Sequence, residues 1–298
     1  MDGIINLLKP PGMTSHDAVN VVRRLTGIKR VGHTGTLDPG AAGVLPICLG
    51  KATRVSEYVL GMDKSYRAEL SLGQATDTED AAGQPVLTRP VPSLTTHGVE
   101  LVLRGFLGTV SQIPPMYSAV RVAGKRLYEL ARRGEVVERE PREIQIYKIK
   151  LLKISETSIL FELDCSRGTY VRTLCRNIAE KLGSAGHMSF LLRTAVGPFL
   201  LGSAVTFEEL AQFAEAGCIT KALLPLDLAL ANMQAVTVDE SQAARLRNGL
   251  AVTLRLKTSD GELFRVYDSS QAFLAIATAD REQIKPLRNW RSLPRPVA

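Results

Sequence analysis

A single carboxylate, Asp38, lies in a stretch rich in glycine and proline that spans residues 32–46. Its Asp-Pro-Gly sequence favours a tight turn, because proline presets φ and aspartate can hydrogen-bond its own backbone. The apolar run at 44–49 that follows is typical of a buried strand. The sequence therefore predicts that Asp38 lies on a tight loop beside a buried strand, where catalytic groups are often mounted, although a carboxylate that merely caps the turn also fits.

Two further side chains, Tyr66 and Arg172, lie in segments whose patterns predict their surroundings. Residues 64–73 alternate between apolar and polar types, so Tyr66 is expected on the buried face of a strand. It fits there either as a core aromatic or as part of a site. Arg172 is predicted to lie in the first turn of a helix, where the macrodipole favours an anion. A surface ion pair is the alternative for this arginine.

These segments resemble the motifs of the TruB-type tRNA pseudouridine synthases, over roughly residues 3–230. One departure is Leu192, which stands where an arginine is usual in the family's L-R-R-T pattern, so one cation that the family has at this point is missing. The motifs that carry the resemblance are G-H-T-G-T-L-D-P at 32–39, K-P-P-G-M-T-S at 9–15, K-x-Y at 64–66, Q-x-P-P-x-x-S-A at 112–119 and C-S-x-G-T-Y-V-R-T at 165–173.

The resemblance implies a reaction and three catalytic residues. Asp38 would be the essential residue of uridine isomerisation, and Tyr66 would stack on the target base. Arg172 would pair with Asp38, orient it through two parallel hydrogen bonds and keep it ionised by lowering its pKa. The implied substrate is the uridine at position 55 in the T-loop of tRNA, with its base flipped out of the stack. Whether Asp38 acts as a nucleophile or as a base at C2′ stays open.

The implied reaction breaks the N1–C1′ glycosidic bond, rotates the uracil and rejoins it through C5. Since nothing is oxidised and no group leaves, neither a metal nor a nucleotide cofactor is expected, and no Walker or dinucleotide fingerprint occurs. Two rival functions are a non-catalytic RNA-binding module and a nucleoside or glycoside hydrolase. The first does not account for the three catalytic residues together, and the second needs a pair of carboxylates.

A basic segment within residues 121–142 is expected to be an insertion that grips RNA. Leu127, Leu130 and Ala131 form an apolar stripe that leaves basic side chains on the other faces, as in a nucleic-acid footprint. A solvated helix face is the alternative. By the resemblance, His33 could fill the space left by the flipped base; a polar surface residue at the tip of a loop is the alternative. Lys9 is either a cation near the site or a solvated charge. The residues expected to bind substrate or RNA are Lys9, His33, Tyr170, Leu191, Arg121, Lys125, Arg126, Arg132 and Arg133.

The elements that position these residues predict an α+β fold. By the resemblance, residues 1–232 form the catalytic domain, a large mixed, mainly antiparallel sheet flanked by helices, and residues 233–298 form a small β-rich, PUA-like module that binds RNA. Strands are predicted at 144–154 and 158–165, paired as antiparallel neighbours, and at 251–256, 263–267 and 273–278 in the module. Helices are expected to begin at the N-caps Ser15, Thr169 and Thr206, the last with a Glu209 capping box.

The composition is that of an ordinary globular protein, and its moderately basic charge fits either a polyanionic partner or solubility alone. Its net charge is +7 and its pI about 9.3 over 298 residues. The four cysteines have no C-x-x-C spacing, so neither a zinc site nor a disulfide framework is expected. Without a signal peptide or an apolar run of ~20 residues, a cytoplasmic protein is expected. It is expected to act on the T-arm of tRNA as a monomer.

Overall fold

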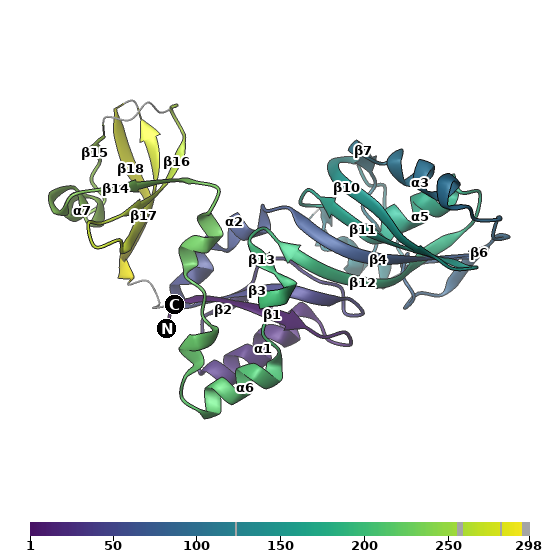
Figure 1. The fold of residues 1–298 in the computed structure, drawn as a ribbon, viewed down its shortest axis with the longest axis horizontal. Helices are drawn as coiled ribbons and strands as arrows, with labels where there is room; N and C mark the ends of the chain where they lie inside the picture. The colour runs from purple at the N-terminus through teal and green to yellow at the C-terminus, as the bar shows by residue number, and fades with distance from the viewer. Residues whose placement is uncertain (123, 255–258, 281, 294–298) are drawn as a thin grey trace.

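The computed structural model describes residues 1–122, 124–254, 259–280 and 282–293, and two large β-sheets dominate it (Figure 1). Helices and strands both occur along the chain, which confirms the predicted α+β class. The first sheet is mainly antiparallel, as predicted, because the β3–β12 pairing is the only parallel one in it. This nine-stranded sheet has the order β1 (Gly3–Lys9), β3 (Ala42–Leu49), β12 (Gly186–Val196), β4 (Lys64–Leu72), β11 (Ser158–Cys165), β10 (Arg142–Ile154) and β7 (Gly108–Gln112), with β2 (Val31–His33) beside β3 and β13 (Phe199–Leu200) beside β12.

The parallel ladder between β3 and β12 joins the two halves of this sheet. It contains only two pairs, Leu192 with Ala42 and Arg193 with Gly43. Gly43 has φ 120°, and a Cβ at this position would lie 2.2 Å from the Arg193 carbonyl oxygen, so only glycine fits. The loop at residues 34–41 enters β3 at this junction, and Asp38 therefore lies where the two halves meet.

Helices cover different parts of the sheet. Helices α1 (Ser15–Thr26) and α6 (Phe207–Glu215) pack on β1 and β3, whereas α3 (Thr96–Arg104) and α5 (Val171–Lys181) pack on β4, β10 and β11 (Figure 1). The capping box of α6, Thr206 with Glu209, is confirmed. The N-cap of α1 is Thr14 and not the predicted Ser15, because Thr14 and Asp17 exchange capping hydrogen bonds.

Shorter elements connect these layers. After β3 the chain forms a 3₁₀ helix (Gly50–Val55) and α2 (Ser56–Leu60), and β5 (Gln74–Thr76) pairs with β6 (Pro85–Thr88). The segment expected to be an insertion contains β8 (Arg121–Val122), β9 (Lys125–Arg126) and α4 (Leu127–Ala131). Further 3₁₀ turns are Leu201–Ser203, Ile219–Ala222 and Leu226–Leu230. No helix among the described residues is long and apolar enough to cross a bilayer.

The second sheet confirms the β-rich C-terminal module. Its order is β14 (Gln234–Thr237), β16 (Leu263–Tyr267), β17 (Phe273–Asp280), β18 (Gln283–Leu293) and β15 (Val252–Thr253), with α7 (Glu240–Arg247) against it. Two of the three predicted runs form β16 and β17. The third is shorter than predicted, and residues 255–256 of that run lie outside the described residues. The sequence did not predict β18 or α7.

A shared apolar core joins this module to the first sheet. Trp290 and Phe273 of the module belong to the same buried cluster as Val44 and Cys48 of β3. The Arg54 guanidinium lies 4.7 Å from the centre of the Trp290 ring, and its Nη1 donates to the Asn289 carbonyl at 2.8 Å. The module is therefore packed against β3 and the 3₁₀ helix that follows it.

Candidate active site

The loop that carries Asp38 is held by side chains from the first motif of the chain. The Ser15 hydroxyl accepts from the Leu37 N–H at 2.8 Å and donates to the Leu37 carbonyl at 3.1 Å. Lys9 is fully buried, and its Nζ donates to the carbonyls of Pro10 and Met13 at 2.8 Å and of Pro39 at 3.4 Å. These bonds fix the residues on both sides of Asp38.

Lys9 is therefore not the solvated charge that the sequence allowed. Burial is the main reason that its pKa falls to about 8; the Arg193 charge also lowers it, while Asp38 raises it. A fully buried ammonium that is bonded to three carbonyls has no surface to offer an RNA phosphate. Lys9 is instead a cation near the site, the other alternative that the sequence allowed, and its hydrogen-bond partners are backbone groups of the Asp38 loop and the preceding turn.

Arg193 holds the same loop from the other side. Its side chain is almost fully buried, and it donates from Nε to the Val44 carbonyl at 2.7 Å and from Nη1 and Nη2 to the Thr36 and Gly35 carbonyls at 3.4 Å. Sequence reasoning did not assign this residue to the site. The alternation of residue types in β12 could have revealed its position. Leu191 and Arg193 lie on the same buried face of the strand, whereas Leu192 faces the other side.

Arg172 and Asp38 lie in direct contact, as the resemblance implied. Arg172 Nε lies 3.0 Å from Asp38 Oδ2, and Nη2 donates to Oδ1 at 3.4 Å. The guanidinium is nearly buried, with a side chain 6% exposed, while that of Asp38 is 33% exposed. The carboxylate is thus oriented by a buried fork and remains open on one side.

The surroundings of Arg172 fix the guanidinium in turn. Its Nη1 donates to the Thr78 carbonyl at 3.0 Å and its Nη2 to the Tyr117 carbonyl at 2.8 Å. Asp80 Oδ2 lies 3.8 Å from Nη1, which places a second carboxylate beside the pair. The sequence analysis did not assign Asp80 to the site, because Thr78 and Arg172 are 94 positions apart in the chain and no local pattern reveals the contact.

The pKa of Asp38 lies above its ordinary value of 3.8, contrary to the prediction that Arg172 would lower it. Burial of the carboxyl group is the largest cause and raises the pKa. The Arg172 charge acts downward as predicted, and Asp80 acts upward. Burial and the Asp80 charge together therefore outweigh the ion pair with Arg172 in setting the pKa of Asp38.

Tyr66 lies at the base of the site as part of the buried core. Its side chain packs in the cluster that contains Leu37 and Leu191. Burial raises its pKa to about 12, while the neighbouring Arg193 acts in the opposite direction. Tyr66 is therefore a protonated phenol at neutral pH, and both of its interpretations, core aromatic and site residue, fit this position.

His33 and Tyr170 lie at the ends of the two elements that frame the site. His33 ends β2 and is half-buried, and its Nδ1 accepts from the Gly35 N–H at 3.3 Å. Burial, then Arg193 and His16, lower its pKa, so the ring is neutral at pH 7. Tyr170 is the N-cap of α5, one residue later than the predicted Thr169; the Gln112 side-chain amide bonds both its N–H and its carbonyl.

The five basic residues of the insertion that the sequence analysis expected to bind RNA are all exposed, as a phosphate-binding surface requires. Their contacts differ. Arg126 and Arg132 lie over the Tyr128 ring, with their guanidinium carbons 5.8 and 5.4 Å from its centre. Lys125 and Arg133 make no such ring contact among the described residues. The five are Arg121, Lys125, Arg126, Arg132 and Arg133.

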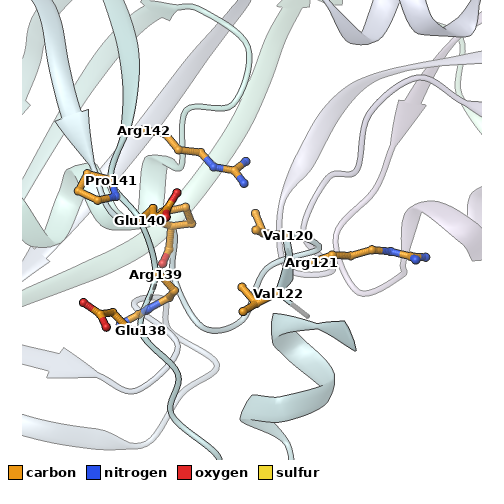
Figure 2. Close-up of a pocket in the computed structure, with 9 residues that line it drawn as sticks. Val120, Arg121, Val122, Glu138, Arg139, Glu140, Pro141 and Arg142 are labelled. Atoms are coloured by element: carbon orange, nitrogen blue, oxygen red, sulfur yellow. Dashed lines mark hydrogen bonds between the residues drawn. The ribbon is translucent and has the colours of Figure 1, made fainter. Parts of the chain in front are cut away.

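A cavity of about 280 Å³ lies at the base of this insertion, apart from Asp38. Figure 2 shows it between residues 120–122 and residues 138–142, with the Arg121 guanidinium pointing away from the latter segment. Its walls mix three arginines with two glutamates and are therefore not selective for an anion. None of the three expected catalytic residues lines it.

The arrangement around Asp38 has one accessible carboxylate, one buried guanidinium that orients it, and a buried phenol close by. Such a carboxylate can attack an electron-poor carbon or accept a proton from it. Among the described residues, no group of three or more His, Cys, Asp or Glu side chains is arranged to hold a metal ion.

Comparison with known proteins gives one consistent result along the chain. Residues 23–171 match the TruB family pseudouridylate synthase N-terminal domain, residues 172–231 the tRNA pseudouridylate synthase B C-terminal domain, and residues 235–289 the C-terminal domain of pseudouridine synthase II TruB. The protein named tRNA pseudouridine synthase B of Symbiobacterium thermophilum is 51% identical over 258 residues, which cover 86% of this chain and 84% of that protein. That of Geobacillus thermodenitrificans is 46% identical over 302 residues, with 98% and 100% covered.

Solved structures give the same fold. A chain of a Cbf5-Nop10-Gar1 complex has a TM-score of 0.77 at 28% identity, over 98% of this chain and 85% of that one. A chain of an H/ACA RNP bound to a substrate RNA containing 2′-deoxyuridine has a TM-score of 0.76 at 26% identity, with 98% and 86% covered. The similarity includes the C-terminal module, since it extends over nearly the whole chain.

Proposed function

The chain belongs to the TruB family of pseudouridylate synthases, and on that premise we propose that it converts the uridine at position 55 in the T-loop of tRNA to pseudouridine. The observation that carries the proposal is the contact between Arg172 and the partly open carboxylate of Asp38. The names of the relatives, tRNA pseudouridine synthase B, support tRNA as the substrate.

In the proposed reaction, Asp38 is the group that acts on the nucleoside. The N1–C1′ bond breaks, the uracil rotates, and a C5–C1′ bond forms; the C5 proton leaves and N1 gains a proton, so atoms and charge balance. Asp38 would serve either as nucleophile or as base at C2′, and both routes need the ionised carboxylate. Arg172 keeps it directed at the nucleoside, and a fixed charge costs no reorganisation during the reaction.

The other site residues would hold the flipped base. Tyr66 would stack on the base, beside Leu191 of the same buried cluster, and stacking on a base is worth ~1–3 kcal/mol. The half-buried, neutral ring of His33 suits the space that the target base vacates in the RNA stack. Tyr170 is the N-cap of α5, two residues before Arg172, and would also contact the nucleoside from that end of the helix.

The RNA-binding surface would extend beyond the site. We assign residues 1–232 to a catalytic domain whose exposed insertion binds phosphates of the T-arm, and residues 233–298 to a module that adds further contacts. The protein would act as a monomer, without a metal or nucleotide cofactor. Four free cysteines, three of them buried, support a reducing compartment and a cytoplasmic location.

Incubation with tRNA that carries tritium at uridine C5 tests this function directly. Formation of the C5–C1′ bond expels tritium into water while the base stays attached to the RNA. Release of tritium with retained base is the expected result. Free uracil would instead indicate a hydrolase, and tRNA binding without either product would indicate an RNA-binding module.

A further inference from the structure

The acidic loop at residues 76–80 lies against α5, the helix that carries Arg172. Its backbone is fixed to β12, because the Met188 N–H donates to the Glu79 carbonyl at 3.0 Å and the Ala81 N–H donates to the Met188 carbonyl at 3.1 Å. From this position the loop presents the Thr78 carbonyl and the Asp80 carboxylate to Arg172. The placement of the loop therefore sets two neighbours of the guanidinium.

Glu79 points from this loop into the same helix. It is 7% exposed, its Oε2 accepts from the Thr173 hydroxyl at 2.6 Å, and its other oxygen forms an ion pair with Arg176. Thr173 directly follows Arg172, and Arg176 lies one turn further along α5. Glu79 thus ties the acidic loop to the helical turn that holds the guanidinium.

The backbone of Glu79 adopts a conformation that residues other than glycine rarely adopt. Its φ is 63°, in the left-handed region, although the residue is not glycine. Such a conformation persists where the surrounding structure holds it, and here the Thr76 hydroxyl bonds the Asp80 carbonyl at 2.6 Å. The turn directs Glu79 toward α5 while Thr78 and Asp80, its neighbours, face Arg172.

We propose that Glu79 is a positioning residue that holds the Arg172 guanidinium against Asp38 by locking the acidic loop to α5. Glu79 itself contacts neither Asp38 nor any group expected to touch the base. It acts through the Thr78 carbonyl and through the helical turn from Arg172 to Arg176. The inference rests on the proposed function, because its effect is on the rate of that isomerisation.

The variant Glu79→Gln keeps the shape of the side chain and removes its charge. Weakening a charged hydrogen-bond network should lower kcat for tritium release by about tenfold, while the Kd for tRNA stays within about twofold because no RNA-facing group changes. The matched control is Glu180→Gln, which removes the other acid beside Arg176, an exposed carboxylate 3.6 Å away that does not touch the loop. This control should match the wild type.

The pH profile separates positioning from a loss of folded protein. Asp38 is faced by Arg172 on α5, Asp80 on the acidic loop, Lys9 on β1 and the phenol of Tyr66 on β4. Because Arg172 lowers the pKa of Asp38, a loosened guanidinium should move the acid limb of kcat/KM to higher pH in Glu79→Gln. A smaller folded fraction would reduce the amplitude and leave the limb in place.

A double-mutant cycle gives the decisive comparison. In an Arg172→Lys background the fork is already lost, so adding Glu79→Gln should change the rate by less than about twofold. An equal tenfold loss in both backgrounds, or an unchanged kcat in Glu79→Gln, would overturn the proposal. If Glu79→Gln does not fold, Thr173→Val removes one bond from the helix side and should lower kcat by about threefold with the same pH shift; no effect would equally overturn it. Wild-type protein that releases no tritium would refute the proposed function instead.

Discussion

Asp38 is oriented by its partner and yet remains reachable. Nε and Nη2 of Arg172 grip both carboxylate oxygens, while a third of the Asp38 side chain is exposed. A carboxylate that were fully enclosed could not reach a nucleoside, and a free surface carboxylate would sample many directions. The combination suits a group that must approach one atom of a bound sugar or base.

Replacing the Arg172 guanidinium by an ammonium should show how much the orientation of Asp38 contributes to the rate. Arg172→Lys keeps the charge but cannot form the fork or reach the Thr78 and Tyr117 carbonyls together. We expect kcat for tritium release to fall by about tenfold or more. Binding of tRNA, measured by filter retention, should stay within a few-fold; full activity in this variant would contradict the role given to the fork.

The raised pKa of Asp38 predicts the pH dependence. The carboxylate must be ionised to act, and burial shifts its protonation above pH 3.8. The acid limb of kcat/KM, which reports the free enzyme, should therefore have its midpoint above this value, with activity lost as the pH falls through it. Circular dichroism at each pH provides the control for unfolding. A rate that stays constant down to pH 4 would disagree with this prediction.

Among single residues, the sequence predicted those that lie in recognisable motifs. Asp38 and Arg172 were paired through a resemblance, and the structure brings them together. Arg193, Asp80 and Glu79 were missed, because their partners lie in segments far along the chain and the local pattern is that of an ordinary strand or turn. The net direction of the Asp38 pKa was also wrong, since burial cannot be weighed against an ion pair without coordinates.

At the scale of elements, the β3–β12 junction is the tightest constraint on the catalytic loop. Gly43→Ala would place a methyl group 2.2 Å from the Arg193 carbonyl oxygen at φ 120°. The steric contact and the unfavourable φ both involve backbone atoms, which cannot move aside. The variant should therefore be destabilised by roughly 1–3 kcal/mol or more. Thermal unfolding would measure this loss.

Gly40→Ala is the matched control for that experiment. Gly40 lies in the same loop, its φ is outside the left-handed region, and a Cβ there would meet nothing within 4 Å. Its melting temperature should stay near that of the wild type. Equal stability of the two alanine variants would mean that the close approach of β3 and β12 does not constrain the loop.

Strands with clean alternation were predicted almost to the residue, while helix starts were not. The limits of β11 match the predicted 158–165, because every second residue is buried against α3 and α5. The starts of α1 and α5 shifted by one residue, since Ser15 is recruited by the Asp38 loop and Gln112 satisfies the backbone of Tyr170. Tertiary contacts thus overrode local capping preferences.

At the scale of the whole molecule, the exposed basic side chains and the buried cations around Asp38 lie in different segments of the chain. The insertion presents its basic side chains to solvent, whereas Lys9 and Arg193 near the site are buried and bonded to carbonyls. Affinity for RNA and catalysis of the isomerisation should therefore respond to different substitutions. The two properties can be tested separately.

Salt dependence measures the contribution of the insertion. Lys125→Ala with Arg133→Ala removes two exposed charges and leaves the arginines that lie over Tyr128 in place. The slope of log K against log salt should become shallower by roughly 1.4–1.8, since each phosphate contact contributes ~0.7–0.9. Lys150→Ala with Lys153→Ala, an equal charge change on exposed positions of β10, is the control. Identical slopes for all three proteins would argue against a phosphate-binding insertion.

The most direct measurement compares tritium release by the wild type and Asp38→Asn. The amide keeps the size of the side chain but has neither the charge nor the basicity of the carboxylate. Release should fall by at least ~10²–10⁴-fold, while tRNA binds within a few-fold of the wild type. Substantial turnover by Asp38→Asn would contradict the account, because the reaction would then proceed without the carboxylate that the loop, Lys9, Arg193 and Arg172 hold in place.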